Sequence, residues 1–217
     1  MHARLHCRIP SILCVIAMAG FANQASAIAE HKLRVEEIAQ LIRDKPVWCV
    51  NRSKDWRTCG AVFRSSLVSA RQVEINQLML SFSETHQTLK RVETMRYSIE
   101  PGGLCIDNDA MSRAPRRWYW AHDKSTALGA QEVQVGEALQ QKQESIFQYF
   151  MRLSNETSGR RPNDRLCLGV SRIGEGDATY LLTPTFAAGT ARAKTAEDEF
   201  RNFSAFSSDP DLNLGYK

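Results

Sequence analysis

The sequence predicts an α+β protein: one antiparallel sheet of about five to seven strands, covered by two helices and stapled by two disulfides. Three observations support this fold class. Short alternating segments are separated by turn signals such as Gly174-Glu175-Gly176-Asp177. Apolar residues follow a helical period mainly over 29–44 and 131–154. An even number of cysteines remains once an N-terminal segment that resembles a secretory signal is set aside.

Length and composition favour a single globular domain. The chain has 217 residues, of which 43% are hydrophobic, so it can bury a substantial core. This composition excludes a collagen-like chain and wholesale disorder. The apolar run 9–22 is too short to span roughly 30 Å of hydrocarbon. We expect one disulfide-stapled domain over 28–189 and a polar C-terminal tail over 190–217.

Residues 1–27 have the features of a cleaved secretory signal. Arg4 and Arg8 precede the apolar run, and Ala25-Ser26-Ala27 fits the A-x-A cleavage pattern. Removing these two arginines from 28 basic residues leaves 26 against 24 acidic ones. We therefore expect an exported protein, periplasmic or extracellular, with Ile28 as its first residue and no transmembrane segment. Its near-neutral charge disfavours nucleic acid as a partner.

The four remaining cysteines predict two disulfides, for which three connectivities are open. We expect Cys49–Cys59, because the residues between them are turn-like and would fold the segment into a hairpin. Cys105 and Cys167 each alternate with aliphatic residues, so they would bridge two neighbouring strands. The spacings do not favour a zinc site, and no C-x-x-C is present for redox catalysis.

The first half of the chain is expected to hold one helix followed by strands. Over 29–44 the apolar residues share one helical stripe, which Lys45-Pro46 ends. The alternation over 73–82 changes phase near Asn76-Gln77, which predicts a β-bulge. Residues 89–99 fit a strand or a helix. Further strands are expected over 104–107 and 116–120.

The second half is expected to hold a helix, a hairpin and the tail. Residues 131–154 have a helical apolar stripe that the polar run Gln140–Glu144 interrupts. The segments 166–173 and 178–186 flank a good turn and predict a hairpin. Phenylalanines spaced by three over 196–206 are compatible with a helix, and the polar last eleven residues predict disorder.

Arginines and tryptophans gather between residues 113 and 124. If 116–120 is a strand, Trp118 and Trp120 share one face, while Arg117 and Tyr119 share the other. The tryptophans could be core that the arginines rim. Alternatively, the cluster could be an exposed platform for an anionic envelope glycan, a lipid headgroup or an acidic protein surface. The candidate binding residues are Arg113, Arg116, Arg117, Trp118, Trp120 and Lys124.

No complete catalytic motif is present, and no cofactor or metal site is expected. The G-x-S-x-G and H-E-x-x-H patterns do not occur. Asp107, Asp109, His86 and His122 are scattered candidates for a hydrolase, although Asp107 and Asp109 also fit a turn that ends a strand. Convergence of His122 with either aspartate in one pocket would favour catalysis.

These observations favour one class of function over two others. We expect a non-catalytic exported protein that binds a component of the cell envelope or a protein partner. An extracytoplasmic hydrolase and a secreted inhibitor or effector are the alternatives. Fold class alone does not choose among the three.

Overall fold

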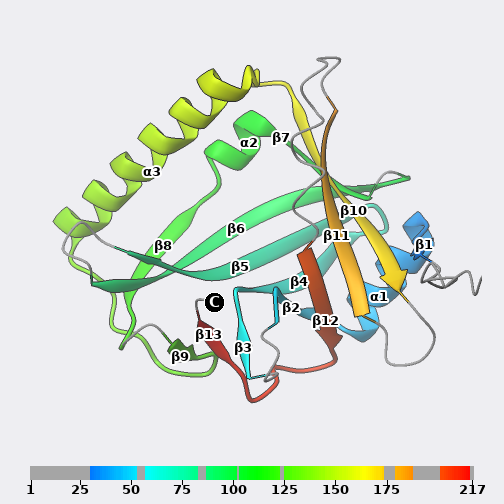
Figure 1. Cartoon of the computed structure of the whole chain (residues 1–217), viewed down its shortest axis with the longest axis horizontal. Helices are drawn as coiled ribbons and strands as arrows, with labels where there is room; N and C mark the ends of the chain where they lie inside the picture. The colour runs from blue at the N-terminus through cyan, green and yellow to red at the C-terminus, as the bar shows by residue number, and fades with distance from the viewer. Residues whose placement is uncertain are drawn as a thin grey trace, which may run out of the picture.

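A closed antiparallel barrel, rather than an open sheet, is the centre of the molecule (Figure 1). The computed structural model describes residues 30–52, 57–82, 87–101, 103–122, 125–173, 179–187 and 201–215. Within these residues, eight strands form the ring, each antiparallel to the next, and β7 pairs back onto β10 to close it. Around the ring they are β10 (Arg165–Ile173), β11 (Thr179–Ala187), β12 (Arg201–Phe206), β2 (Val47–Val50), β4 (Ala61–Ser69), β5 (Gln72–Phe82), β6 (Thr88–Glu100) and β7 (Gly103–Asp107). The expected α+β sheet under two helices is therefore wrong.

Additional elements extend the ring or cover it. β1 (Glu30–Lys32) pairs with β10, and β8 (Arg116–Trp120) pairs with the first half of β6. A small second sheet consists of β3 (Thr58–Cys59), β9 (Ser125–Ala127) and β13 (Asn213–Gly215). The helices are α1 (Val35–Asp44), α2 (Asn108–Ser112) and α3 (Glu137–Ser158). In the part of the chain described, no helix combines the length and apolar character needed to cross a membrane.

The barrel interior is filled with side chains. The ring of Phe203 stacks on Trp48 at 4.7 Å and on Tyr180 at 5.0 Å between centroids. Ile38 and Ile42 of α1 join the same buried cluster, so this helix closes one end of the barrel. Aromatic rings and aliphatic side chains thus occupy the space in which some barrels hold a ligand.

The apolar phase change over 73–82 reflects two buried faces, not the expected bulge. Ile75 points into the barrel, whereas Leu78 and Leu80 have the opposite parity and pack outside it. There they meet Leu214 of the second sheet. The register between β5 and β6 is continuous, and the irregular position lies in β4 instead.

Several expected elements are present, but the tail differs from the expectation. Residues 29–44 divide into β1 and α1, and the ambiguous segment 89–99 is strand. The hairpin around residues 174–177 is confirmed as β10 and β11. Residues 201–206, expected as helix, form β12, and part of the expected disordered end forms β13. Each of these two strands completes a sheet by pairing with a segment far away in the chain, and no local sequence pattern requires that pairing. The predicted signal lies outside the described residues.

Both expected disulfides are confirmed. Cys49–Cys59 has a Cα–Cα distance of 5.3 Å, but its two strands do not pair as a hairpin: β2 pairs with β4, and β3 belongs to the second sheet. This bridge therefore ties the small sheet to the barrel. Cys105–Cys167 joins directly opposed residues, 4.0 Å apart at Cα, across the β7–β10 seam that closes the ring.

Gly103 begins β7 where two backbones come unusually close. Its φ is +124°, a conformation that side chains with a Cβ rarely adopt. A Cβ at this position would lie 2.1 Å from the carbonyl oxygen of Leu168 in β10. Gly103 is therefore a glycine that the barrel seam requires.

Candidate binding site

Helix α3 lies against β8, beside the barrel (Figure 1). Phe147 and Leu139 of α3 pack on Trp118 of β8 and Leu89 of β6. The helix ends at Gly159, whose φ of +66° is the left-handed conformation common at helix C-termini. This apolar contact is small, so polar contacts contribute substantially to holding the helix in place.

A buried ion-pair cluster links α3 to the strands beneath it: Arg91, Glu93 and Arg116 come from the strands, and Glu144, which is 37% exposed, comes from the helix. Arg116 Nε donates to Glu93 Oε1 at 2.8 Å, and Arg116 Nη1 donates to Glu144 Oε1 at 3.1 Å. The side chains of Arg116 and Glu93 are only 2% and 6% exposed. Arg116 also donates to the carbonyl oxygens of Met111, Ser112 and Ala114. Such burial of charge is tolerated because each group has partners.

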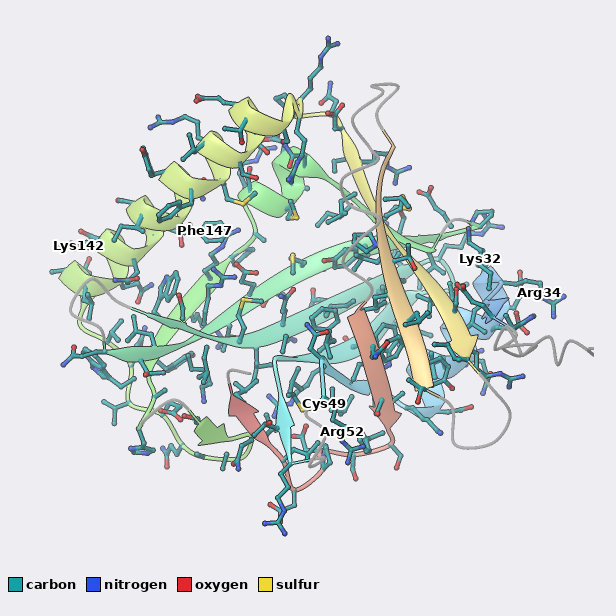
Figure 2. All side chains as sticks on the ribbon, viewed as in Figure 1. Lys32, Arg34, Cys49, Arg52, Lys142 and Phe147 are labelled. Atoms are coloured by element: carbon teal, nitrogen blue, oxygen red, sulfur yellow. A yellow bond between two sulfur atoms is a disulfide. The ribbon has the colours of Figure 1, made fainter. Side chains whose placement is uncertain are left out.

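An aromatic ring completes this ion-pair cluster. Arg91 Nε lies 3.1 Å from the Glu93 oxygen that Arg116 also contacts. The Phe147 ring centroid is 3.7 Å from the guanidinium carbon of Arg116 and 4.8 Å from that of Arg91. Figure 2 shows Phe147 on the side of α3 that faces the barrel. The two guanidinium groups therefore anchor the helix instead of facing solvent.

A groove of about 940 Å³ opens between α3 and the beginning of β8. Its volume falls in the range of roughly 300–1,000 Å³ typical of small-molecule sites. Two arginines and two glutamates in the lining balance each other in charge. The lining is otherwise rich in amides, contributed by Gln134, Gln140, Gln141 and Gln148.

Hydrogen bonds within the protein orient several of these amides. Gln148 donates to the carbonyl oxygen of Ser112 at 2.8 Å, and Gln134 donates to Gln140 at 3.2 Å. Arg113, at the rim, is 74% exposed and pairs with Asp109. Each amide carries two donor hydrogens and an acceptor oxygen, so the groove presents both kinds of hydrogen-bonding group to a ligand.

The structure separates the residues of the sequence-predicted platform. Trp118 is buried at 2% exposure and Trp120 is partly buried, while Arg113 and Arg117 are exposed. Arg116 is turned inward, and Lys124 lies outside the described residues. Of these six positions, Arg113 and Arg116 line the groove.

Sequence reasoning missed the glutamines of the groove. Their one signal is the polar run Gln140–Glu144, which interrupts the apolar pattern of the helix. That run lines the groove through Gln140, Gln141 and Glu144. A polar stretch on a helix is more often a solvated face, so the pattern alone did not identify a site.

The acidic and histidine candidates for a hydrolase do not converge. Asp107 pairs with Arg165 of β10, and Asp109 pairs with Arg113, three residues before β8 begins. His122 follows the other end of this five-residue strand, which spans about 16 Å. His86 lies outside the described residues. Among the residues with described positions, no group of three histidine, cysteine or acidic residues could hold a metal ion.

Comparison of the chain with protein-family models, curated proteins and solved structures gave no match. The features of the molecule that bear on function are the filled barrel, the anchored helix α3 and the amide-lined groove beside it.

Proposed function

We propose that this protein is an exported, non-catalytic binding protein of the cell envelope that holds a hydroxyl-rich, glycan-like component in the groove between α3 and β8. The observation that carries the proposal is the lining, in which four glutamines surround a groove of about 940 Å³. Amides donate and accept hydrogen bonds, as sugar hydroxyl and acetamido groups require. The two disulfides are compatible with export to the periplasm or the extracellular space.

The charges around the groove favour a neutral ligand over the anionic partners considered from the sequence. Arg116 is surrounded by protein acceptors, and Arg113 pairs with Asp109. Glu137 and Glu144 add two carboxylates to the lining. These carboxylates offset the arginines of the lining, so a lipid phosphate or an acidic protein surface would meet no net attraction there, whereas a neutral sugar needs none.

The packed barrel also supports a site outside the ring. Trp48, Tyr180 and Phe203 form a continuous aromatic stack in the interior, and α1 covers one end. A ligand would have to displace these buried rings to enter. The groove needs no such rearrangement, because its amides lie at the surface.

Titration with a β-1,4-linked N-acetylglucosamine tetramer, followed by calorimetry, tests the proposal. The double variant Gln134→Leu/Gln141→Leu removes two groove amides and should weaken binding by about 10–30-fold, since each hydrogen bond contributes about 1 kcal/mol. Gln131→Leu changes an exposed glutamine outside the lining and should leave the affinity unchanged.

Two results would overturn the assignment. Equal weakening by Gln131→Leu would show that the effect is not specific to the groove. If the protein bound only acidic polysaccharides, and salt weakened that binding strongly, the basis of recognition would be charge and not hydrogen bonding.

A further inference from the structure

The side of α3 that points away from the barrel carries an apolar stripe, which we call the outer stripe. It consists of Ile146, Tyr149, Phe150 and Leu153, at the i, i+3, i+4, i+7 spacing of one helix face. Tyr149 is 52% exposed, Phe150 60% and Leu153 40%. An apolar hollow of about 440 Å³ lies over the stripe, next to Lys142.

The polarity of α3 is in part the reverse of that of an ordinary surface helix, although Phe147 and Leu139 pack inward. Gln143, on the side facing the protein, is only 3% exposed, and Glu144 reaches Arg116 beneath the helix. An amphipathic helix normally turns its apolar residues to the core. Contiguous exposed apolar residues mark contact surfaces. The orientation of α3 therefore indicates that the outer stripe contacts a partner.

We propose that the outer stripe binds the same stripe of a second copy, so that two α3 helices pair antiparallel about a two-fold axis. The stripe is symmetric about the midpoint between Tyr149 and Phe150. Antiparallel pairing about this point brings together the Tyr149 and Phe150 rings of the two copies. It also places Ile146 against Leu153, so aromatic meets aromatic and aliphatic meets aliphatic.

The charges at the ends of the outer stripe follow the same symmetry. Lys142 precedes the stripe and Glu156 follows it. The exact two-fold partner of position 142 would be position 157, so Glu156 lies one residue, about 1.5 Å along the helix axis, from the symmetric position. Their helical angles differ by about 40°, so both lie on one flank. Because like flanks face each other in an antiparallel pair, Lys142 of each copy would approach Glu156 of the other.

The size of the outer stripe predicts a weak dimer. One helix face lies at the small end of the range of specific interfaces, below the roughly 1,200 Å² of stable ones. We therefore expect a dissociation constant of about 10–100 μM and rapid exchange.

The proposed dimer does not depend on the proposed function, but the role of the dimer in ligand binding does. Ser145 borders both the groove and the hollow over the outer stripe, so the two surfaces adjoin on one helix. Pairing through α3 would hold two grooves close together. A repeating glycan could then occupy both, which raises the apparent affinity without any new contact.

Sedimentation velocity over about 5–300 μM tests the dimer. The wild-type protein should shift from monomer to dimer over this range. Phe150→Glu should raise the dissociation constant more than tenfold, because it places a charge in the centre of the contact. The matched control is Val68→Glu, which changes an exposed apolar residue of β4 and should have no effect.

Charge reversal in trans tests the antiparallel arrangement. Lys142→Glu and Glu156→Lys should each weaken self-association, since each places like charges together twice. An equimolar mixture of the two variants should associate again, because every contact then joins opposite charges. A mixture that remains monomeric would overturn the antiparallel pairing.

Two further outcomes would overturn the proposal. One is a wild-type protein that stays monomeric to 300 μM. The other is a monomer that binds vesicles of phosphatidylglycerol through Phe150, which would make the outer stripe a membrane contact. The glycan titration is independent of both, because Phe150→Glu leaves the groove lining intact. Loss of dimerisation and loss of ligand binding can therefore be told apart.

Discussion

Replacing Arg116 with methionine tests whether the buried ion-pair cluster holds α3 on the barrel. The substitution keeps an unbranched side chain but removes the guanidinium. That group lies 2.8 Å from Glu93 and 3.1 Å from Glu144 and also binds three carbonyl oxygens of residues 111–114. We expect the variant to fold less stably and to release α3 more readily.

The magnitude follows from what the substitution leaves behind. Glu93 is 6% exposed and would lose its closest cation, whereas Glu144 is 37% exposed and can be solvated. Breaking a buried ion pair from one side costs about 3–5 kcal/mol. Arg91 remains 3.1 Å from Glu93 and compensates in part. We therefore expect a loss of about 3 kcal/mol in the free energy of unfolding, at the low end of this range.

Urea denaturation followed by tryptophan fluorescence measures this loss. Arg117→Met changes the exposed neighbour on the same strand and should alter stability by no more than about 0.5 kcal/mol. Adding Glu93→Gln to Arg116→Met should recover part of the loss, because no unpaired carboxylate then remains. A loss below about 1 kcal/mol, or equal losses in Arg116→Met and Arg117→Met, would refute the reasoning.

Three further predictions concern the barrel seam, the glycine beside it and helix α1. Cys105→Ser should lower the urea midpoint more than Cys59→Ser, because the loops that they close correspond to about 4.3 and 2.8 kcal/mol of chain entropy; equal midpoints would contradict this. Gly103→Ala should lower the melting temperature sharply, since its Cβ would lie 2.1 Å from a carbonyl oxygen of β10; an unchanged melting temperature would argue against the seam. Hydrogen bonds from the backbone and then the side chain of Arg34 lower the pKa of Glu37 from 4.5 to about 2. The stabilisation that Glu37 contributes is therefore complete above pH 4.5 and is lost as the pH falls towards 2. Glu37→Gln should make the free energy of unfolding less dependent on pH over this range, and curves of equal slope for the variant and the wild type would contradict the prediction.

Local patterns in the sequence predicted much of the secondary structure. Alternation and turn residues act over a few positions, so strands such as β7, β8, β10 and β11 could be recognised, and both disulfides followed from their contexts. Closure of the barrel depends on β12, which lies between β11 and β2 although residues 201–206 are far from β2 in the chain. Its regularly spaced phenylalanines fit a helix equally well, and only the neighbouring strands decide the outcome.

The candidate site was less accessible to sequence reasoning. Strand parity places Arg116 and Trp118 on one face, but it does not show that α3 covers that face. Because α3 covers this face, Arg116 and Trp118 are buried and hold the helix instead of forming the exposed platform considered from the sequence. The glutamines of the groove can be recognised as a candidate site only from their position beside β8.

A spectrum of the glutamine side-chain amides, recorded during titration with the N-acetylglucosamine tetramer, tests the proposed function most directly. Selective ¹⁵N labelling of glutamine makes the groove amides visible in solution. We predict saturable shifts of Gln134, Gln140, Gln141 and Gln148, while Gln131 stays in place. Groove amides that do not move at saturating tetramer, or shifts confined to residues outside the groove, would contradict the account.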